Sequence, residues 1–291
     1  MSLIDTLNTG VSALNAFSTG LDVVGNNIAN VNTIGYKSAS TSFEDSFSNT
    51  LKSSSPATGT SSSTTPIQVG TGVEVAGTAT NYAQGALTST GVATDLAVSG
   101  NGFFIVRDPT TLNEFATRDG EFTVNSSGYL VTQNGQQVMG YTGGSSASPL
   151  GTTVGPIQIG QNPPNGTSLQ SVTIDSSGNV VEAYSNGTTA TTNKVLLQDF
   201  GNTSALLNNG NNLYTNLSAA APIGGGILSG SNTAGANGLG NIQSGSLESS
   251  NVDLTQEFSN LITMQRSFQA GARLITVSDT VLDDIVNLKR S

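Results

Sequence analysis

The N-terminal stretch LIDTLNTGVSALNAFSTGLDVVGNNIANV, residues 3–31, decides the fold, because its apolar residues recur at alternating steps of four and three. Residues spaced in this way fall on one side of an α-helix, and a sustained repeat forms a coiled-coil-like seam. An isolated helix gains little from an unburied apolar stripe, so this helix needs a partner. The predicted N-terminal seam consists of Leu3, Leu7, Leu14, Phe17, Leu21, Val24, Ile28 and Val31.

The second long helical pattern lies at the other end of the chain, at about 252–290. Asp253 and Gln256 have the spacing of a capping box, which favours a helix start there. Both terminal stretches also carry apolar residues beside their seams, which indicates burial from more than one side. We therefore expect the two ends to pair and copies of the chain to self-assemble; the simpler alternative is a helix pair within one molecule. The C-terminal seam consists of Leu254, Phe258, Leu261, Phe268, Ala272, Ile275, Leu282 and Val286.

Composition and charge exclude several classes of function. The 291-residue chain has a net charge of −10 and only nine basic residues, so binding to nucleic acid or to an anionic membrane is not expected. No apolar run approaches the length of a membrane-spanning helix, and the first residues lack the features of a secretory signal. We expect either a cytoplasmic protein or export by a route that reads no such signal. The absence of Cys and His excludes disulfides and any nucleophile–His relay.

Between the two helical stretches the apolar pattern changes to a period of two, which is typical of short β-strands. Asn-Gly pairs, which favour tight turns, occur at 101–102, 134–135, 165–166, 186–187, 209–210 and 237–238. The stretches 122–131 and 172–181 each read as strand, Gly-containing turn and strand, so we expect two hairpins of one β-rich domain. The predicted fold class is α+β, with paired long N- and C-terminal α-helices and a central β-rich domain made of short strands and hairpins.

Composition also sets the expected boundaries. A Ser/Thr-rich segment with two prolines follows the first helix and predicts an extended connector, with Phe43 and Phe47 as candidate anchors. A Gly-rich segment after the strands predicts a return connector. The expected divisions are the N-terminal helix at 1–36, the connector at 37–66, the β-rich outer domain at 67–208, the return connector at 209–250 and the C-terminal helix at 251–291.

No constellation of residues indicates catalysis. Adjacent carboxylates at 44–45 and 283–284 would diverge by about 100° on a helix and would not face one substrate. Asp119 and Glu121 could share a strand face, where solvated charge is far more common than catalysis. The glycine runs lack the setting and the Lys of a phosphate-binding loop. The sequence therefore predicts no enzyme activity, no metal site and no cofactor.

Three blocks of the sequence resemble the bacterial flagellar rod and hook proteins. The first is GNNIANVNTIGYK at 25–37, the second joins 85–91, 95–106 and 115–122, and the third joins 245–258, 265–268 and 287–290. All three occur in the order expected of that family and together span nearly the whole chain. The family motif positions that they carry are Asn26, Asn27, Asn30, Gly35, Tyr36, Gly100, Gly102, Phe103, Phe104 and Asn251.

The resemblance implies a structural subunit that polymerises into a helical tube, with the terminal helices lining the inner tube and the β domain forming the outer wall. The implied partners are copies of the chain itself, other axial proteins (rod, hook-cap and hook–filament junction proteins) and the export apparatus, with no nucleic acid and no membrane insertion. The implied location is the flagellum, in the hook or basal body. The implied route there is flagellar type III export without a cleaved signal peptide.

Within the family, SNVDLTQEF at 250–258 and VLLQDF at 195–200 resemble hook proteins. The sequence therefore predicts a short hook subunit, part of a flexible universal joint that transmits torque from rod to filament. The departure is length, because the stretch between Tyr141 and the second hairpin is too short for the additional outer domain of many hook proteins. The alternative is a distal rod subunit of the basal body, and a remote alternative is a secreted β-rich adhesin.

Overall fold

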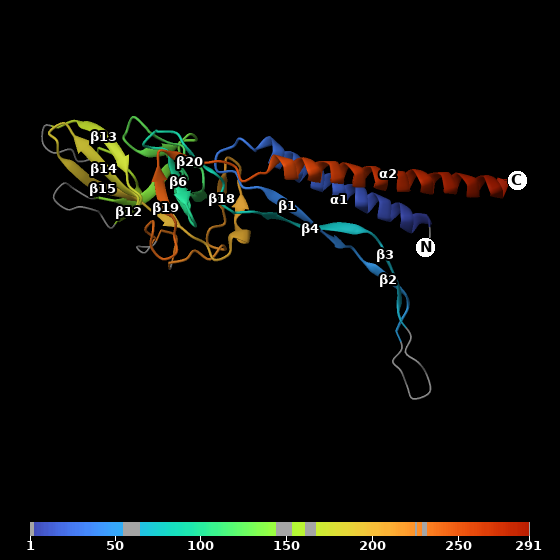
Figure 1. Ribbon diagram of the computed structural model, residues 1–291. Coiled ribbons are helices and arrows are strands. Elements are labelled where there is room, and N and C mark those ends of the chain that lie inside the picture. Colours follow the sequence, from blue (N-terminus) through green and yellow to red (C-terminus); the bar gives the residue numbers. More distant parts are fainter. Residues whose placement is uncertain are drawn as a thin grey trace. The chain divides into compact units, whose positions relative to one another are not determined.

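The computed structural model describes residues 3–54, 65–143, 153–160, 167–224, 226–228 and 232–290. The chain divides into two compact units. Unit 1 comprises Met1–Ala29, Ser38–Asn81 and Val252–Ser291, and unit 2 comprises Asn30–Lys37 and Tyr82–Asn251. Both helices belong to unit 1 and most strands to unit 2, which confirms the predicted α+β class with terminal helices and a β-rich middle (Figure 1). Over their described residues, neither helix is apolar for a length that could cross a membrane.

The two helices of unit 1 are α1 (Leu3–Ala29) and α2 (Leu254–Arg290), which lie side by side and antiparallel (Figure 1). The Thr6 and Ser278 hydroxyls lie 3.4 Å apart near one end of the pair. Near the other end, Asn27 Nδ2 donates to Glu257 Oε1 at 3.2 Å. The long contact between the two ends of the chain therefore exists within one molecule.

Small residues let the two helices approach closely. A Cβ atom added at Gly10 would lie 2.9 Å from Ile275 Cγ1, and one added at Gly271 would lie 3.3 Å from Leu14 Cδ2. Both distances are at or below the tight end of ordinary packing, so a larger residue would push the helices apart. The helix start predicted at Asp253 is confirmed, because its Oδ1 accepts from the backbone N–H of residues 255 and 256 at 2.8 and 3.3 Å.

The predicted connector at 37–66 is wrong over its described residues, because it contains paired strands. Antiparallel pairs join β1 (Ala39–Asp45) to β4 (Val73–Thr80) and β2 (Ser48–Lys52) to β3 (Ile67–Gly70). The ladder satisfies the backbone of this Ser/Thr-rich sequence, which needs little core of its own. Residues 67–81 belong to unit 1 rather than to the β-rich domain, where the sequence placed them.

Of the two candidate anchors in this segment, only Phe43 is packed. Its ring meets that of Phe17 edge-on, with 5.8 Å between ring centroids. Phe47 is 65% exposed, so its proposed anchoring role is wrong within one molecule. Residues 55–64 of the predicted connector lie outside the described residues.

The strands of unit 2 form one large antiparallel sheet and two separate pairs. The order along the large sheet is β13-β14-β15-β11-β7-β8-β18-β17; β10 and β12 also pair with β11, β16 with β7, and β9 with β10. The separate pairs are β19–β6 and β20–β5. The bounds are β5 (Leu87–Ser89), β6 (Leu96–Ser99), β7 (Phe103–Arg107), β8 (Glu114–Thr117), β9 (Phe122–Val124), β10 (Leu130–Thr132), β11 (Gln137–Thr142), β12 (Thr153–Pro156), β13 (Leu169–Ile174), β14 (Asn179–Tyr184), β15 (Thr189–Val195), β16 (Leu197–Gln198), β17 (Leu207–Asn208), β18 (Leu213–Thr215), β19 (Asn241–Ser244) and β20 (Ser246–Glu248), with a 3-10 turn at Thr203–Ala205.

Both predicted hairpins are confirmed, as β9–β10 and β13–β14. The Asn-Gly pairs at 134–135, 186–187 and 209–210 lie between consecutive strands, and their glycines have positive φ, as tight turns require. The pair at 165–166 lies outside the described residues.

The predicted return connector at 209–250 is wrong in part, because it supplies three strands to unit 2. β19 pairs with β6 and β20 with β5, while Ile242 and Leu247 are buried beneath them. Each strand has too few residues for a local apolar period, and the partners of β19 and β20 are far away in sequence. Strand β7, in contrast, has a clear apolar signal in its own sequence. Its continuous apolar run is buried on both faces, with Phe103 facing one core and Phe104 the other.

Candidate functional site

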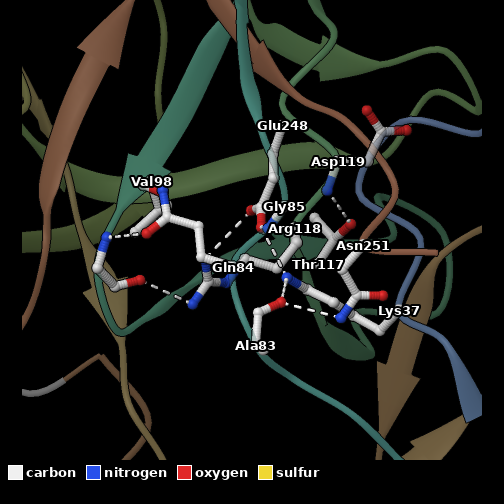
Figure 2. A network of polar contacts seen from close by, with 11 residues as sticks. Lys37, Ala83, Gln84, Gly85, Val98, Thr117, Arg118, Asp119, Glu248 and Asn251 are labelled. Carbon is white, nitrogen blue, oxygen red and sulfur yellow. Dashed lines mark hydrogen bonds and ion pairs between the residues drawn. The ribbon is translucent and has the colours of Figure 1, made fainter. Parts of the chain in front are cut away.

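Three charged side chains meet inside unit 2 (Figure 2). Lys37 Nζ lies 2.6 Å from Glu248 Oε1, and Arg118 Nη1 lies 3.2 Å from Glu248 Oε2. The exposed fractions of the three residues are 3%, 4% and 1% for Lys37, Arg118 and Glu248. We call these three residues the ion cluster; both ion pairs found among the described residues belong to it.

The ion cluster holds together segments of unit 2 that are far apart in the sequence. Lys37 ends the first segment of unit 2, and its Nζ also donates to Ala83 O at 2.9 Å. Ala83 O accepts a second hydrogen bond, from Asn251 Nδ2 at 3.0 Å. The backbone N–H of Gly85 donates to Glu248 Oε1 at 2.9 Å. Segments that are far apart in the sequence are thereby fixed to one carboxylate (Figure 2).

Backbone and aromatic contacts complete the surroundings of the cluster. The N–H of Gly35 donates to Glu248 O at 2.8 Å. Gly35 has φ +68°, and a Cβ atom there would lie 2.7 Å from the carbonyl carbon of Arg118, so only glycine fits. Arg118 Nη2 donates to Gly100 O at 3.0 Å, and Arg118 Cζ lies 5.0 Å from the ring centroid of Phe103.

The charges of the cluster do not balance, because two cations share one carboxylate. Burial lowers the pKa of Lys37, and pairing with Glu248 opposes that shift. Burial likewise lowers the pKa of the Arg118 guanidinium, again against the opposing effect of Glu248. Such a cluster depends on its single anion, because an uncompensated buried charge is costly. The cluster is suited to a structural role, in which it holds segments of the chain together. Among the described residues, no group of three His, Cys, Asp or Glu side chains could hold a metal ion.

Several predicted family motif positions converge on this cluster. Gly35, Gly100, Phe103 and Asn251 contact it directly or through Ala83 O. The remaining positions lie elsewhere: Asn26 is exposed, Asn30 Oδ1 accepts from the Thr33 hydroxyl at 3.0 Å, and Tyr36, Gly102 and Phe104 are buried.

Asn27 has a separate position in unit 1. It is fully buried, its Nδ2 donates to Ala39 O at 2.7 Å, and its Oδ1 accepts from Ala39 N–H at 3.0 Å. This pair of hydrogen bonds mimics a backbone partner and fixes the first residue of β1 to the last turn of α1.

The predicted N-terminal seam lies mostly on partly covered surface. Val24 is buried, and Leu7, Leu14, Phe17, Leu21 and Ile28 are partly buried. Val31 is partly buried but lies beyond α1, in unit 2. The side chain of Leu3 lies outside the described residues.

The predicted C-terminal seam coincides only in part with the face of α2 that contacts α1. Leu261, Ala272, Ile275 and Leu282 are partly buried, whereas Leu254, Phe258, Phe268 and Val286 are 36–54% exposed. Among the side chains of α2 that the structure describes, Gly271 and Ser278 are the buried ones. Apolar residues occur all around α2, so their spacing could not select the face that meets α1; small residues decide it.

The sequence reasoning missed all three members of the ion cluster. One signal for them was available, because Lys37, Arg118 and Glu248 lie one in each of the three motif blocks at 25–37, 115–122 and 245–258. In a chain with only nine basic residues, an isolated cation inside a motif block is a reasonable candidate for a buried pair.

Three family models match the chain in the regions just described. "Flagella basal body rod protein" matches residues 7–37, "Flagellar hook protein FlgE/F/G D1 domain" matches 97–182, and "Flagellar basal body rod FlgEFG protein C-terminal" matches 243–288.

Individual relatives agree with these matches. The chain is 36% identical over 288 residues to a protein of Bacillus subtilis (strain 168) named "Flagellar basal-body rod protein FlgG", covering 99% of this chain and 100% of the relative. It is 28% identical over 449 aligned residues to "Flagellar hook protein FlgE" of Borreliella burgdorferi, covering 99% and 100%. A "Flagellar hook protein FlgE" of Helicobacter mustelae is 42% identical over 140 residues, which cover 48% of this chain and 31% of the relative.

Proposed function

Because the chain belongs to the flagellar rod and hook protein family, we propose that it is a structural subunit of the distal rod in the flagellar basal body. This reverses the order of the two candidates that the sequence suggested, in which the hook came first. The observation that carries the proposal is the end-to-end match to a rod protein, with 36% identity over 288 residues that cover 99% of this chain and 100% of the relative. The Borreliella hook relative needs 449 aligned residues for the same coverage, so it holds sequence that this 291-residue chain lacks.

The proposed role is mechanical rather than enzymatic. Copies of the chain polymerise through unit 1 into a helical tube, whose inner part is formed by the terminal helices. Apolar side chains support this assembly, because they stay exposed along α2 and would be covered by neighbouring copies. The large ones are Leu254, Phe258, Ile262, Phe268, Leu274, Val277, Val281, Ile285, Val286 and Leu288. Other axial proteins of the rod and hook are the further proposed partners, and flagellar type III export is the proposed route.

The ion cluster supports this role at the level of one subunit. It holds residues 30–37, 82–85 and 248–251 together inside unit 2, so both outgoing and returning segments are fixed. A subunit that carries load needs such fixed segments, because they keep the fold of unit 2 intact under force.

The hook remains a second candidate, favoured by one observation: the 42% identity over 140 residues to the Helicobacter hook protein. Deleting the gene and imaging the isolated basal bodies by electron microscopy separates the two functions. A rod subunit predicts basal bodies whose rod is incomplete and which carry no hook. Complete rods without hooks would contradict the rod and support the hook, and normal hook–basal bodies would contradict both. Restoring the gene provides the control.

A further inference from the structure

The face of α2 directed away from α1 combines two arginines with apolar residues. Ile262 and Val277 are 53% and 61% exposed, and Arg266 and Arg273 are exposed between them. With 3.6 residues per turn, these four side chains fall within about 60° of one another around the helix. They lie on the side opposite Gly271, which packs against α1. We call these four residues the outward face of α2.

The outward face carries positive charge that its own helix does not neutralise. Neither arginine has an acidic residue three or four positions away in either direction, where helical ion pairs form. Both ion pairs found among the described residues involve Glu248, so neither belongs to Arg266 or Arg273. Arginine presents several donors in a planar fork, which suits a pair of carboxylates.

The complementary charge lies on the β1–β4 pair of unit 1. Glu44 and Glu74 are directly opposite each other in the ladder, and both are exposed. Like charges at directly opposed positions destabilise a sheet, and neither strand contains a basic residue to relieve the repulsion. The exposed face of β1 continues from Glu44 with the small residues Ser42 and Ser40, which leave room for a helix to lie close. We call Glu44, Glu74, Ser42 and Ser40 the acidic ribbon face.

We propose that the outward face of α2 in one copy docks on the acidic ribbon face of a neighbouring copy, with Arg266 and Arg273 bound to Glu44 and Glu74. The occupant is a second copy, because the two faces carry opposite charges and all four charged side chains are exposed within one chain. The spacing fits, since the two arginines are separated by about 10.5 Å along the helix axis and each side chain can reach inward to the carboxylate pair between them. This inference rests on the proposed assembly and names a contact within it.

Charge reversal of the full-length chain tests this contact. The variants are E44K/E74K, R266E/R273E and the combination of all four substitutions, with D5K/D22K as a matched control of two other exposed carboxylates in unit 1. The critical concentration for assembly is measured by sedimentation. Far-UV circular dichroism and thermal unfolding of dilute protein verify that each variant is folded.

Each double reversal should raise the critical concentration at least about tenfold, because it places like charges across the contact. The four-fold variant should return to within about threefold of the unaltered chain, since the contact is restored with its charges exchanged, and the D5K/D22K control should stay within the same range. Reversals without effect, or a four-fold variant as impaired as its parents, would overturn this inference but not the proposed function. Failure of the unaltered chain to assemble at all would overturn both.

Discussion

Replacing Glu248 by Gln removes the one anion of the ion cluster and keeps its size. Lys37 Nζ and Arg118 Nη1, at 2.6 and 3.2 Å from the carboxylate, would then be buried cations that have lost their paired carboxylate. Breaking a buried pair in this way costs about 3–5 kcal/mol. The NH2 group of the amide would also replace one accepting oxygen, facing either Lys37 Nζ and the Gly85 N–H or Arg118 Nη1, so at least one hydrogen bond of the site is lost as well. We expect E248Q to lower the free energy of unfolding of unit 2 by about 3–5 kcal/mol.

K37M should cost less, about 1–2 kcal/mol, because Arg118 and Glu248 remain as a one-to-one pair. The order of the two costs therefore follows from the charge imbalance of the cluster. If Glu248 stabilised the fold only through its shape and packing, E248Q would not cost more than K37M.

Tyrosine fluorescence provides a clean assay for both variants. The chain has no Trp and six Tyr, and all six lie in segments of unit 2. With a urea dependence of about 2 kcal/mol per molar, E248Q should lower the urea midpoint of the fluorescence transition by about 2 M. E114Q is the matched control, because Glu114 is partly exposed in the same unit, and it should change the free energy by less than about 0.5 kcal/mol. A loss below about 1 kcal/mol in E248Q, or a larger loss in K37M, would refute the reasoning.

Three further substitutions probe other parts of the structure. N27A removes both hydrogen bonds to Ala39 and should destabilise unit 1 by about 2–3 kcal/mol, with faster hydrogen exchange of the Ala39 amide; unchanged exchange would contradict the assigned contact. G271V forces a branched side chain against Leu14 and should cost about 1–3 kcal/mol of helix-pair stability by thermal circular dichroism, whereas an unchanged melting curve would argue against close packing there. Burial raises the pKa of the Asp119 carboxyl, so its ionisation in the folded state lowers the free energy of unfolding as the pH rises through that pKa. In urea titrations, D119N should therefore become more stable relative to the unaltered chain as the pH rises. A stability difference that does not depend on pH would contradict the shift.

The parts of the fold that the sequence predicted correctly are those with a local signal. The terminal helices carry a long apolar period, and the β9–β10 and β13–β14 hairpins combine alternation with a Gly turn. The β1–β4 and β2–β3 pairs were missed because Ser and Thr dominate their sequence and little of their surface is buried. β19 and β20 were missed because their partners, β6 and β5, are about 150 residues away.

The ion cluster illustrates the same limit for the site. Lys37 and Glu248 are separated by 211 residues in sequence, so no spacing rule can bring them together. The motif blocks indicated which segments matter, while the pairing of charges across them required the fold. The contact face of α2 was mispredicted for a different reason, since an apolar pattern does not register a glycine, and Gly271 is one of the two glycines at which the helices pack closely.

The most direct test of the central claim is electron cryomicroscopy of hook–basal bodies isolated from cells that carry this chain, at a resolution that shows side chains. The rod assignment predicts that density of the distal rod fits this sequence, with bulky Phe103 and Phe104 in β7 and a close α1–α2 contact at Gly271. Density that fits this sequence in the hook, and another sequence in the distal rod, would contradict it.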